Sequence, residues 1–371
     1  MQRRYKLQYV WAIGIALALP LVALAAYTYT AFDYVGVLYG TTPGTATITE
    51  AFGIDNSGKI VGGFCADGDT GPGWGGGCSA PGNAPSHGYV RFKQGTATIF
   101  KAINYPNNSF ETEATGTNGR TIVGLYDPTI PVPANADLGK GFYCTFSSST
   151  GCTDFHTVVY PGSTSTDLQA VNEYGDMVGL YSLIAVPPFT DFGFLLSKGK
   201  FCTIDIGKAP GHKDAVDTNA LGISEENSVV GSYDDPLTGV TAFLMTDVEV
   251  EQYKKGKPQL CEFKKLTTFV YPGAGVHQTE AAGISEGGLI VGNYLDNTPN
   301  PDTSHAFQVQ SNPDGTINTA TYATIDFIPL QPGDNAAASI NPKGTVVVGN
   351  FEDTRPPYST LAPKERAWIA K

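Results

Sequence analysis

The sequence predicts an all-β fold, a six-bladed β-propeller built from four-stranded antiparallel blades. Three observations support this: one motif recurs six times, each repeat contains about four short strand-like runs, and the composition is unlike that of helical proteins. Of the 371 residues, 16% are charged and 41% hydrophobic, and the chain contains 44 Gly and 25 Pro. This composition argues against disorder, a helical bundle and a coiled coil.

The repeated motif is a pair of apolar residues followed by glycine and, two residues later, an aromatic residue. Six copies spaced by roughly equal intervals are far beyond chance, and they set the number of blades. We expect the glycine to relieve crowding where neighbouring sheets face each other, because glycine in a strand often marks a close approach. The six glycines are Gly62, Gly124, Gly179, Gly231, Gly292 and Gly349.

Three further marks accompany the motif in most copies. A Gly-Ile-Asp-like segment precedes it, a small residue beside an aromatic one follows it, and a Thr-Ile-Asp-like segment comes last. Short runs rich in Val, Ile, Thr, Tyr and Phe, bounded by Gly, Pro, Asn and Asp, are typical of strands. Each repeat is therefore expected to contain four strands, A to D in chain order, with the apolar-apolar-glycine motif in strand B.

The two ends of the chain favour a closed ring over an open solenoid, the main alternative. The chain ends on a C strand at Arg366-Ala367-Trp368-Ile369, and no D strand follows it. Residues 28–34 look like a D strand that precedes the first A strand. If the N-terminal strand completes the last blade, the ring closes and exposed sheet edges disappear.

The first residues have the three-part layout of a secretory signal peptide. Arg3, Arg4 and Lys6 precede an apolar run, which ends at the small-residue site Ala23-Leu24-Ala25. An uncleaved membrane anchor is the alternative, because the run is near the lower length limit for spanning. We expect residues 1–25 to be removed, leaving residues 26–371 as a single propeller domain without a membrane span. The expected location is the periplasm, the cell surface or the medium of a bacterium.

Six cysteines agree with export, because disulfides persist in oxidising compartments. Two pairs bracket short loops, and the remaining two cysteines are left to pair with each other, although spacing alone does not settle the connectivity. A zinc site is the competing interpretation, but the sequence contains no Cys-x-x-Cys. The candidate pairs are Cys65 with Cys78, Cys144 with Cys152, and Cys202 with Cys261.

The order of these marks resembles that of the bacterial extracellular HAF-repeat family. The resemblance is carried by His305-Ala306-Phe307 and its variant His87-Gly88-Tyr89, and it covers nearly all of residues 28–371. It implies a secreted, propeller-like protein without an established activity. No catalytic residue can therefore be carried over from the family.

Acidic residues recur at the start of the expected strand A, directly after a threonine in most copies. If strand A is innermost, these side chains gather at one mouth of the central channel. A second set lies two positions earlier, on the same side of the strand, and two histidines lie in the preceding connections. The candidate ligand or cation residues are Glu50, Glu113, Asp167, Asn219, Glu280, Glu111, Asp217, Asp334, His212 and His277.

Three interpretations of these residues stay open. Threonine and acid could cap the turn between blades through local hydrogen bonds. The acids could instead bind Ca²⁺ or Mg²⁺, which prefer oxygen ligands, or form a catalytic carboxylate site. Like charges ~8 Å apart repel by ~2 kcal/mol at an effective dielectric constant near 20. A dry channel would therefore need a cation or protonation, whereas a wet channel would need neither.

Charge and motifs exclude several classes of function. The net charge of −12 argues against nucleic-acid binding, and no nucleophile elbow, zinc-binding helix or phosphate-binding loop occurs. The expected function is that of a secreted, monomeric binding or scaffold module that presents one propeller face to a glycan or protein ligand. The alternatives are a metal-dependent hydrolase, lactonase or lyase with a cation in the channel, and a structural envelope protein. An enzyme is the less favoured of these, and no catalytic residue can be named.

Overall fold

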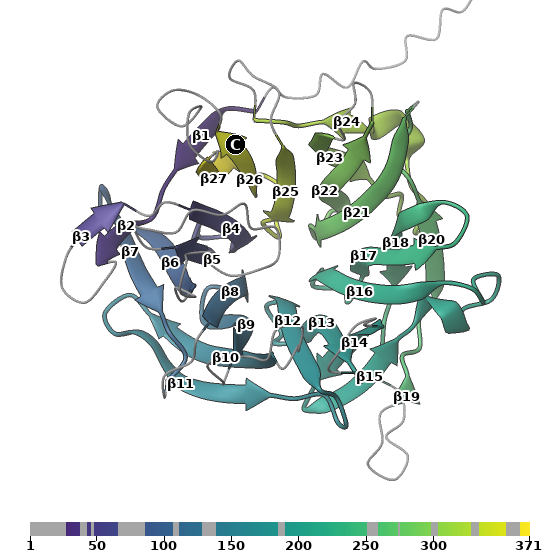
Figure 1. Cartoon of the computed structure of the whole chain (residues 1–371), viewed down its shortest axis with the longest axis horizontal. Helices are drawn as coiled ribbons and strands as arrows, with labels where there is room; N and C mark the ends of the chain where they lie inside the picture. Colours follow the sequence, from purple (N-terminus) through teal and green to yellow (C-terminus); the bar gives the residue numbers. More distant parts are fainter. Residues whose placement is uncertain are drawn as a thin grey trace, which may run out of the picture.

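The structure, a computed structural model, confirms the predicted six-bladed propeller (Figure 1). In each blade strand A lies at one edge of the sheet, and successive A strands contact one another around the ring, so strand A is innermost. The expected signal peptide lies outside the described residues. No helix in the described part of the chain is long and apolar enough to span a membrane. The described residues are 27–37, 43–45, 48–65, 86–106, 111–127, 139–184, 190–250, 259–273, 275–297, 303–327, 334–353 and 364–371.

Blades 1 to 3 follow the predicted order of strands, and all the pairings between strands A, B, C and D are antiparallel. Blade 1 consists of β4 (Ile48–Ile54), β5 (Ile60–Cys65), β6 (His87–Gln94) and β7 (Ala97–Ile103). Blade 2 consists of β8 (Glu111–Thr117), β9 (Thr121–Asp127), β10 (Lys140–Ser147) and β11 (Gly151–Val158). Blade 3 consists of β12 (Ser165–Val171), β13 (Met177–Ser182), β14 (Asp191–Ser197) and β15 (Lys200–Ile204).

Blades 4 to 6 repeat this order, and the D strand of blade 6 comes from the start of the chain. Blade 4 consists of β16 (Val216–Ile223), β17 (Val229–Asp235), β18 (Gly239–Thr246) and β20 (Lys265–Phe269). Blade 5 consists of β21 (Val276–Ile284), β22 (Leu289–Asp296), β23 (Thr303–Gln310) and β24 (Ala323–Thr324). Blade 6 consists of β25 (Asn335–Ile340), β26 (Val347–Asp353), β27 (Lys364–Ala370) and β1 (Tyr29–Phe32).

A few short elements lie outside this pattern. A small hairpin follows β1, two 3₁₀ turns lie in connections, and the strand β19 adds to the outer edge of blade 3 in parallel with β15. The sequence marks did not predict β19, because it belongs to the connection between the C and D strands of blade 4 and reaches back to the preceding blade. These elements are β2 (Val35–Val37), β3 (Pro43–Thr45), η1 (Ile206–Lys208), η2 (Thr319–Thr321) and β19 (Gln259–Leu260).

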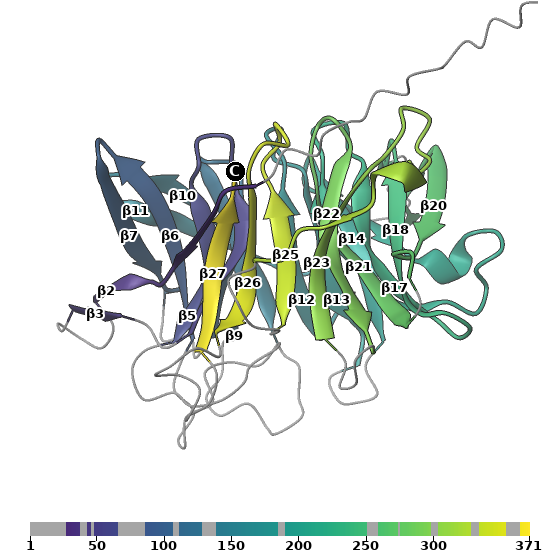
Figure 2. The same cartoon turned by 90° about the horizontal axis from the view of Figure 1, so that it is seen from above.

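The N-terminal strand closes the ring, as predicted. Strand β1 pairs with β27 in antiparallel register, with Ala31 opposite Trp368, and the two strands lie side by side in the side view (Figure 2). Arg366 adds an ionic contact at this junction, because its guanidinium donates to Asp33 at 3.0 Å and to Asp353 at 3.0 Å. The N-terminal segment also contacts blade 5, where the Tyr29 hydroxyl donates to the Ile325 carbonyl at 2.9 Å.

The repeated glycine of strand B relieves crowding inside its own blade, so the expected contact between sheets is wrong at this position. A Cβ on Gly124 would lie 1.9 Å from the carbonyl oxygen of Glu113 in the adjacent strand A. The same clash would occur in all six blades, where strand A has a β-bulge opposite the motif. The close approach between blades occurs instead at the bulge itself, where a Cβ on Gly53 would lie 2.7 Å from the carbonyl of Thr115.

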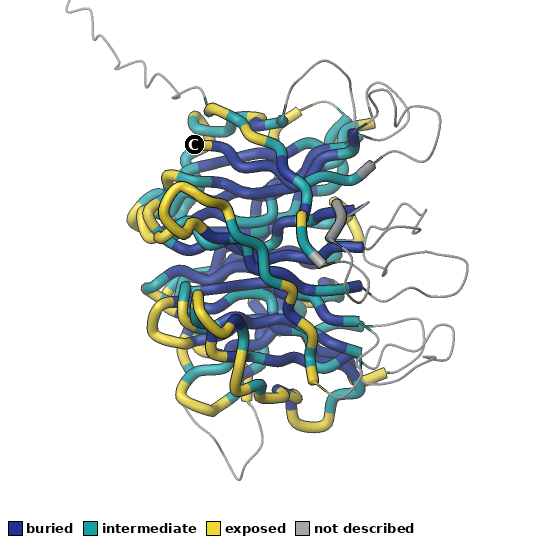
Figure 3. Tube along the Cα trace, turned by 90° about the vertical axis from the view of Figure 1, so that its left-hand side faces the viewer, coloured by how far each residue is buried: buried dark blue, intermediate teal, exposed yellow. Residues whose placement is uncertain are grey.

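A large aromatic residue of strand C lies opposite the strand B glycine in every blade. All six side chains are fully buried, and burying so much ring area is a major stabilising contribution. Buried residues follow the strands through the ring, whereas exposed residues concentrate in the turns (Figure 3). The six residues are Tyr89, Phe142, Phe194, Phe243, Phe307 and Trp368.

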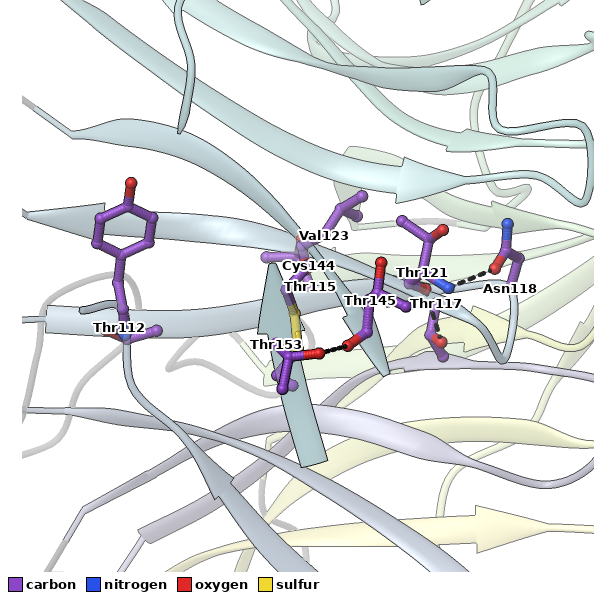
Figure 4. The surroundings of a disulfide bond; sticks show 11 residues. Thr112, Thr115, Thr117, Asn118, Thr121, Val123, Cys144, Thr145 and Thr153 are labelled. Carbon is purple, nitrogen blue, oxygen red and sulfur yellow. Dashed lines mark hydrogen bonds between the residues drawn. A yellow bond between two sulfur atoms is a disulfide. The ribbon is translucent and has the colours of Figure 1, made fainter. Parts of the chain in front are cut away.

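The predicted disulfides agree with the structure within the described residues. Cys144 and Cys152 are bonded across the β10–β11 hairpin, beside a group of threonines that includes Thr145 and Thr153 (Figure 4). Cys202 and Cys261 are bonded with their Cα atoms 4.9 Å apart, which ties the β19 segment to β15. Cys65 is disulfide-bonded too, and its predicted partner Cys78 lies outside the described residues.

Candidate functional site

The candidate site is a collar formed by one residue from each strand A, at the end where that strand enters the blade. In each blade the residue before it accepts a hydrogen bond from the backbone N–H of the connection that arrives from the preceding blade. For example, the Thr112 hydroxyl accepts from the Tyr105 N–H at 3.1 Å. The threonines thus cap the turn between blades, as one interpretation predicted. The six collar positions are Glu50, Glu113, Asp167, Asn219, Glu280 and Ala336.

The capping is repeated six times, so it is a property of the fold. Four of the capping groups besides Thr112 are threonine hydroxyls, and the sixth is the side-chain carbonyl of an asparagine, with donor–acceptor distances of 2.9 to 3.1 Å. These caps fix the backbone position of the next residue, the collar residue, in every blade. The other capping residues are Thr49, Thr166, Thr218, Thr279 and Asn335.

The carboxyl groups of blades 6, 1 and 2 form a cluster. Glu50 forms a side-chain hydrogen bond with Glu365, and Glu113 forms one with Glu111. Both Glu50 and Glu113 lie beside Gly63 of strand β5, because a Cβ there would be in ordinary van der Waals contact with the Glu50 Oε2 at 3.8 Å and the Glu113 Cγ at 3.9 Å. The structure therefore brings three of the predicted acids together and adds Glu365.

Three carboxyl groups of this cluster have pKa values above their ordinary range. Burial, followed by repulsion from Glu365, raises the pKa of Glu50 well above its ordinary value. Burial also raises the pKa of Glu113 to about 8, with a further contribution from Glu111, and raises the pKa of Glu365 to about 7. At neutral pH the cluster therefore presents both O–H donors and oxygen acceptors, which relieves the repulsion expected of a dry collar.

The remaining collar positions differ from this cluster. Glu280 is approached by a serine of the preceding blade, because the Ser232 hydroxyl donates to its Oε2 at 3.2 Å. Burial raises the pKa of Glu280, and the serine hydrogen bond opposes that shift. Asp167 acts electrostatically on Glu113, so it lies at the edge of the cluster. Asn219 and Ala336 are not acidic, so the acidic residues of the collar lie mainly on one side of the ring.

The second set of predicted acids has mixed positions. Asp217 accepts a hydrogen bond from the Asp191 N–H at 3.1 Å, and Asp334 accepts one from the Ser304 N–H at 2.9 Å. Both carboxylates therefore cap neighbouring strands. Asp334 also raises the pKa of Glu365, which places it near the cluster.

The predicted histidines bind local partners rather than the acid cluster. The His212 Nδ1 lies 3.4 Å from the Tyr233 hydroxyl, and the His277 Nδ1 lies 3.3 Å from the Gly275 carbonyl. In the C strand of blade 5, His305 stacks on Tyr294 and pairs with an aspartate, which is a packing role.

The channel narrows behind the collar. All six blades line a cavity of about 50 Å³, which has room for a few water molecules. At the far mouth the turns of different blades are hydrogen-bonded to each other. The Asn56 amide donates to Glu173 at 3.2 Å, and the Glu173 N–H donates to Glu225 at 2.8 Å. The collar therefore faces a narrow channel whose other mouth is crossed by side-chain hydrogen bonds.

The acids do not form a metal centre in the described part of the chain. No three His, Cys, Asp or Glu side chains there are placed to hold a metal ion. The cluster of Glu50, Glu111, Glu113 and Glu365 is consistent with this, because its carboxyl groups are hydrogen-bonded in pairs.

Glu365 is the member of the cluster that sequence reasoning missed. It lies in strand C of blade 6, opposite Glu352, whereas the predicted acids were found by aligning A strands. The sequence offered one indication of its role: Glu365 directly precedes Arg366, in a strand that pairs with the acidic end of β26. Recognising it requires knowing that blade 6 lies against blade 1.

Comparison with known proteins supports the fold only. No family model matches the chain, and no curated protein matches it in sequence. Among solved structures, the chain is similar to the sialidase of Trypanosoma rangeli, with a TM-score of 0.52 and 8% sequence identity. The similarity covers 92% of this chain but only 59% of the sialidase chain, and at this identity it establishes a shared propeller fold and nothing more. The resemblance to HAF repeats stays a prediction from the motifs.

Proposed function

We propose that the protein is an exported binding module that holds a glycan or protein ligand over the collar mouth of its channel. The observation that carries this proposal is the cluster of Glu50, Glu113, Glu111 and Glu365, four carboxyl groups that the fold gathers at the collar although their burial costs free energy. Such an arrangement is unfavourable for stability alone. A role in ligand binding accounts for it.

The chemistry of the cluster selects for hydrogen-bond donors. Carboxyl oxygens accept from hydroxyl, ammonium and guanidinium groups, and charge-assisted bonds of this kind are the stronger ones. An ammonium group that approaches Glu50 and Glu113 would also displace the protons that these residues share with Glu365 and Glu111. The ammonium group would then pair with the resulting carboxylates. An amino sugar or a lysine-rich protein segment presents this chemistry, whereas a phosphate would be repelled by the cluster.

Export is supported by the disulfides. The bonds Cys144–Cys152 and Cys202–Cys261 are stable in the periplasm or outside the cell and would be reduced in most bacterial cytosols. The basic and apolar start of the sequence agrees with this location. A purely structural envelope role would give no reason for a cluster of carboxyl groups at the collar.

A hydrolase that acts without a metal is the second candidate. Its support is the pKa of Glu113, which at about 8 keeps this carboxyl protonated at neutral pH, as a general acid requires. The metal-dependent hydrolase of the sequence analysis has less support, because the described acids do not group around a cation position.

Calorimetric titration with trilysine and with a glucosamine trimer tests the proposal. The protein is expected to bind at least one of these two probes, and Glu50→Ala and Glu113→Ala should each weaken binding by about tenfold or more. Asp154→Asn, which alters an exposed acid of the outer strand β11 away from both the collar and the A–B turns, should leave binding unchanged. Absence of binding by both probes, or equal affinity in the collar variants, contradicts the proposal. Turnover of the glucosamine trimer that Glu113→Ala abolishes would favour the hydrolase.

A further inference from the structure

A groove of about 970 Å³ lies between blades 4 and 5, on the face opposite the collar. Its walls are the A–B turns of the two blades, around Glu226 and Gly287, and their C–D connections, which include Lys265 and residues 310–315. Its floor includes the side chains of Leu244 and Ile284. This volume is within the range of sites that enclose small organic ligands.

The groove exists because the C–D connections of these two blades are long. Blades 1 to 3 close the same connection with tight hairpins, for example between Ser197 and Lys200. In blade 4 strand β18 ends at Thr246 and β20 begins at Lys265, and in blade 5 strand β23 ends at Gln310 and β24 begins at Ala323. Described residues at the ends of the blade 4 connection and in the blade 5 connection line the groove.

Hydrogen bonds hold the walls in place. The Gln310 amide donates to the Gly287 carbonyl at 2.6 Å, and the Ser311 hydroxyl donates to the Gly288 carbonyl at 2.9 Å. Across the blades, the Thr267 hydroxyl donates to the Gly315 carbonyl at 2.7 Å. A groove fixed in this way loses little conformational entropy when a ligand binds.

Most charges in the groove are paired with each other. The Lys264 ammonium lies 3.4 Å from the Asp247 carboxylate, and the Lys265 ammonium lies 3.9 Å from the Asp314 carboxylate. The remaining charges are the exposed acids Glu226 and Glu286. An anionic ligand such as a phosphate would meet this residual negative charge, and no unpaired cation of the lining would attract it.

We infer that this groove binds a neutral, hydroxyl-rich ligand, an oligosaccharide of two or three units. Serine and threonine hydroxyls, amides and backbone groups line it, so a ligand whose groups both donate and accept hydrogen bonds fits it best. None of the described residues that line it is aromatic, so binding rests on hydrogen bonds and is weak, with a Kd of about 0.1 to 1 mM. The inference is independent of the proposed function at the collar, which faces the other way.

Gly287 allows the groove to be filled without disturbing the fold. A Cβ on Gly287 would meet no atom closer than the Ser285 hydroxyl at 4.0 Å, and its φ is not positive. The equivalent position of blade 3, in a turn with the same hydrogen bond, is Tyr174, whose side chain is 79% exposed. Gly287→Tyr should therefore fold and project its ring into the groove, whereas Gly287→Ala adds only a methyl group.

Saturation-transfer NMR and calorimetry with maltotriose, cellotriose and triacetylchitotriose test the inference. The full chain should bind at least one of them, Gly287→Ala should retain that affinity, and Gly287→Tyr should weaken it by about tenfold or more. Glu113→Ala should leave it unchanged, which separates this site from the collar. The inference is overturned if none of the three trisaccharides binds at about 10 mM. It is also overturned if Gly287→Tyr binds as the unaltered chain does while its melting temperature is unchanged.

Discussion

The strand B glycines show how strongly single residues constrain this fold. At Gly124 the space for a side chain is already occupied by the carbonyl of Glu113 and the ring of Phe142. We therefore expect Gly124→Ala to lower the free energy of unfolding by about 3 kcal/mol, since the bulge and the ring must both move. Urea denaturation followed by tryptophan fluorescence measures this. Gly287→Ala, where the space is open, is the matched control and should change stability by less than ~0.5 kcal/mol.

The raised pKa values of Glu113 and Glu365 predict that the stability of the protein depends on pH. Glu113 has a pKa of about 8 and Glu365 of about 7 in the folded protein, against about 4.3 in an unfolded chain. Between about pH 4.3 and pH 8 the folded protein therefore binds more protons than the unfolded chain. The stabilisation from these protons is fully present below about pH 4.3 and is lost as the pH rises to about 8. In Glu113→Gln, which cannot ionise, the melting temperature should fall less over this range.

The control for this prediction is Glu226→Gln, which alters an exposed acid on the other face. Its melting temperature should fall with pH as steeply as that of the unaltered protein. Over this pH range, the falls in melting temperature of the two variants should differ by a few degrees. Parallel curves for Glu113→Gln and the unaltered protein would show that the cluster is hydrated enough to ionise normally.

At the scale of elements, the disulfides should contribute unequally. The bond between Cys202 and Cys261 closes a sequence separation of 59 residues, whereas that between Cys144 and Cys152 closes one of 8. Loop-closure entropy then predicts losses of about 4 kcal/mol and about 2.5 kcal/mol when each pair is changed to alanine. Chemical denaturation of the two double variants measures both values. A larger loss for the hairpin pair would mean that strain or residual structure outweighs chain entropy.

The order of elements was predictable because each repeat carries its own evidence. Strand B could be found from the glycine and its aromatic neighbour, and the threonine cap followed from the recurrence of threonine before the collar position. Strand β19 could not be predicted, because two residues that pair in parallel with a strand of another blade leave no pattern of their own. The role of Gly124 was misassigned for a related reason, since a bulge in strand A cannot be recognised from strand B.

The candidate site was predictable only in part. Glu50 and Glu113 were found because they align between repeats, but the alignment treated all six positions alike. The structure concentrates the acids where blade 6 meets blade 1, and there Glu365 comes from a different strand. Contacts of this kind depend on the three-dimensional neighbours of a blade, so a periodic pattern along the chain does not contain them.

At the scale of the whole molecule, ring closure depends on one short strand. Strand β1 supplies the outer edge of blade 6, and Asp33 beside it binds Arg366. A chain that begins at Tyr34 would leave the edge of β27 without its partner, and free edges promote association between molecules. We expect this truncated chain to form oligomers or aggregates, whereas a chain that begins at Tyr27 should behave as a single species in light scattering.

A peptide with the sequence of residues 27–33 provides the complementary test, because an added strand can pair with a free sheet edge. It should return the truncated protein to the size and melting temperature of the chain that begins at Tyr27. A peptide in which Thr30 is replaced by proline should fail. Thr28 and Lys371 exchange both backbone hydrogen bonds, so the alternation of an antiparallel ladder makes Thr30, opposite Ile369, the next hydrogen-bonded position, and proline lacks the N–H that this position needs. If the truncated chain has the size and stability of the longer one without any peptide, blade 6 is stable with three strands and the closure of the ring contributes nothing.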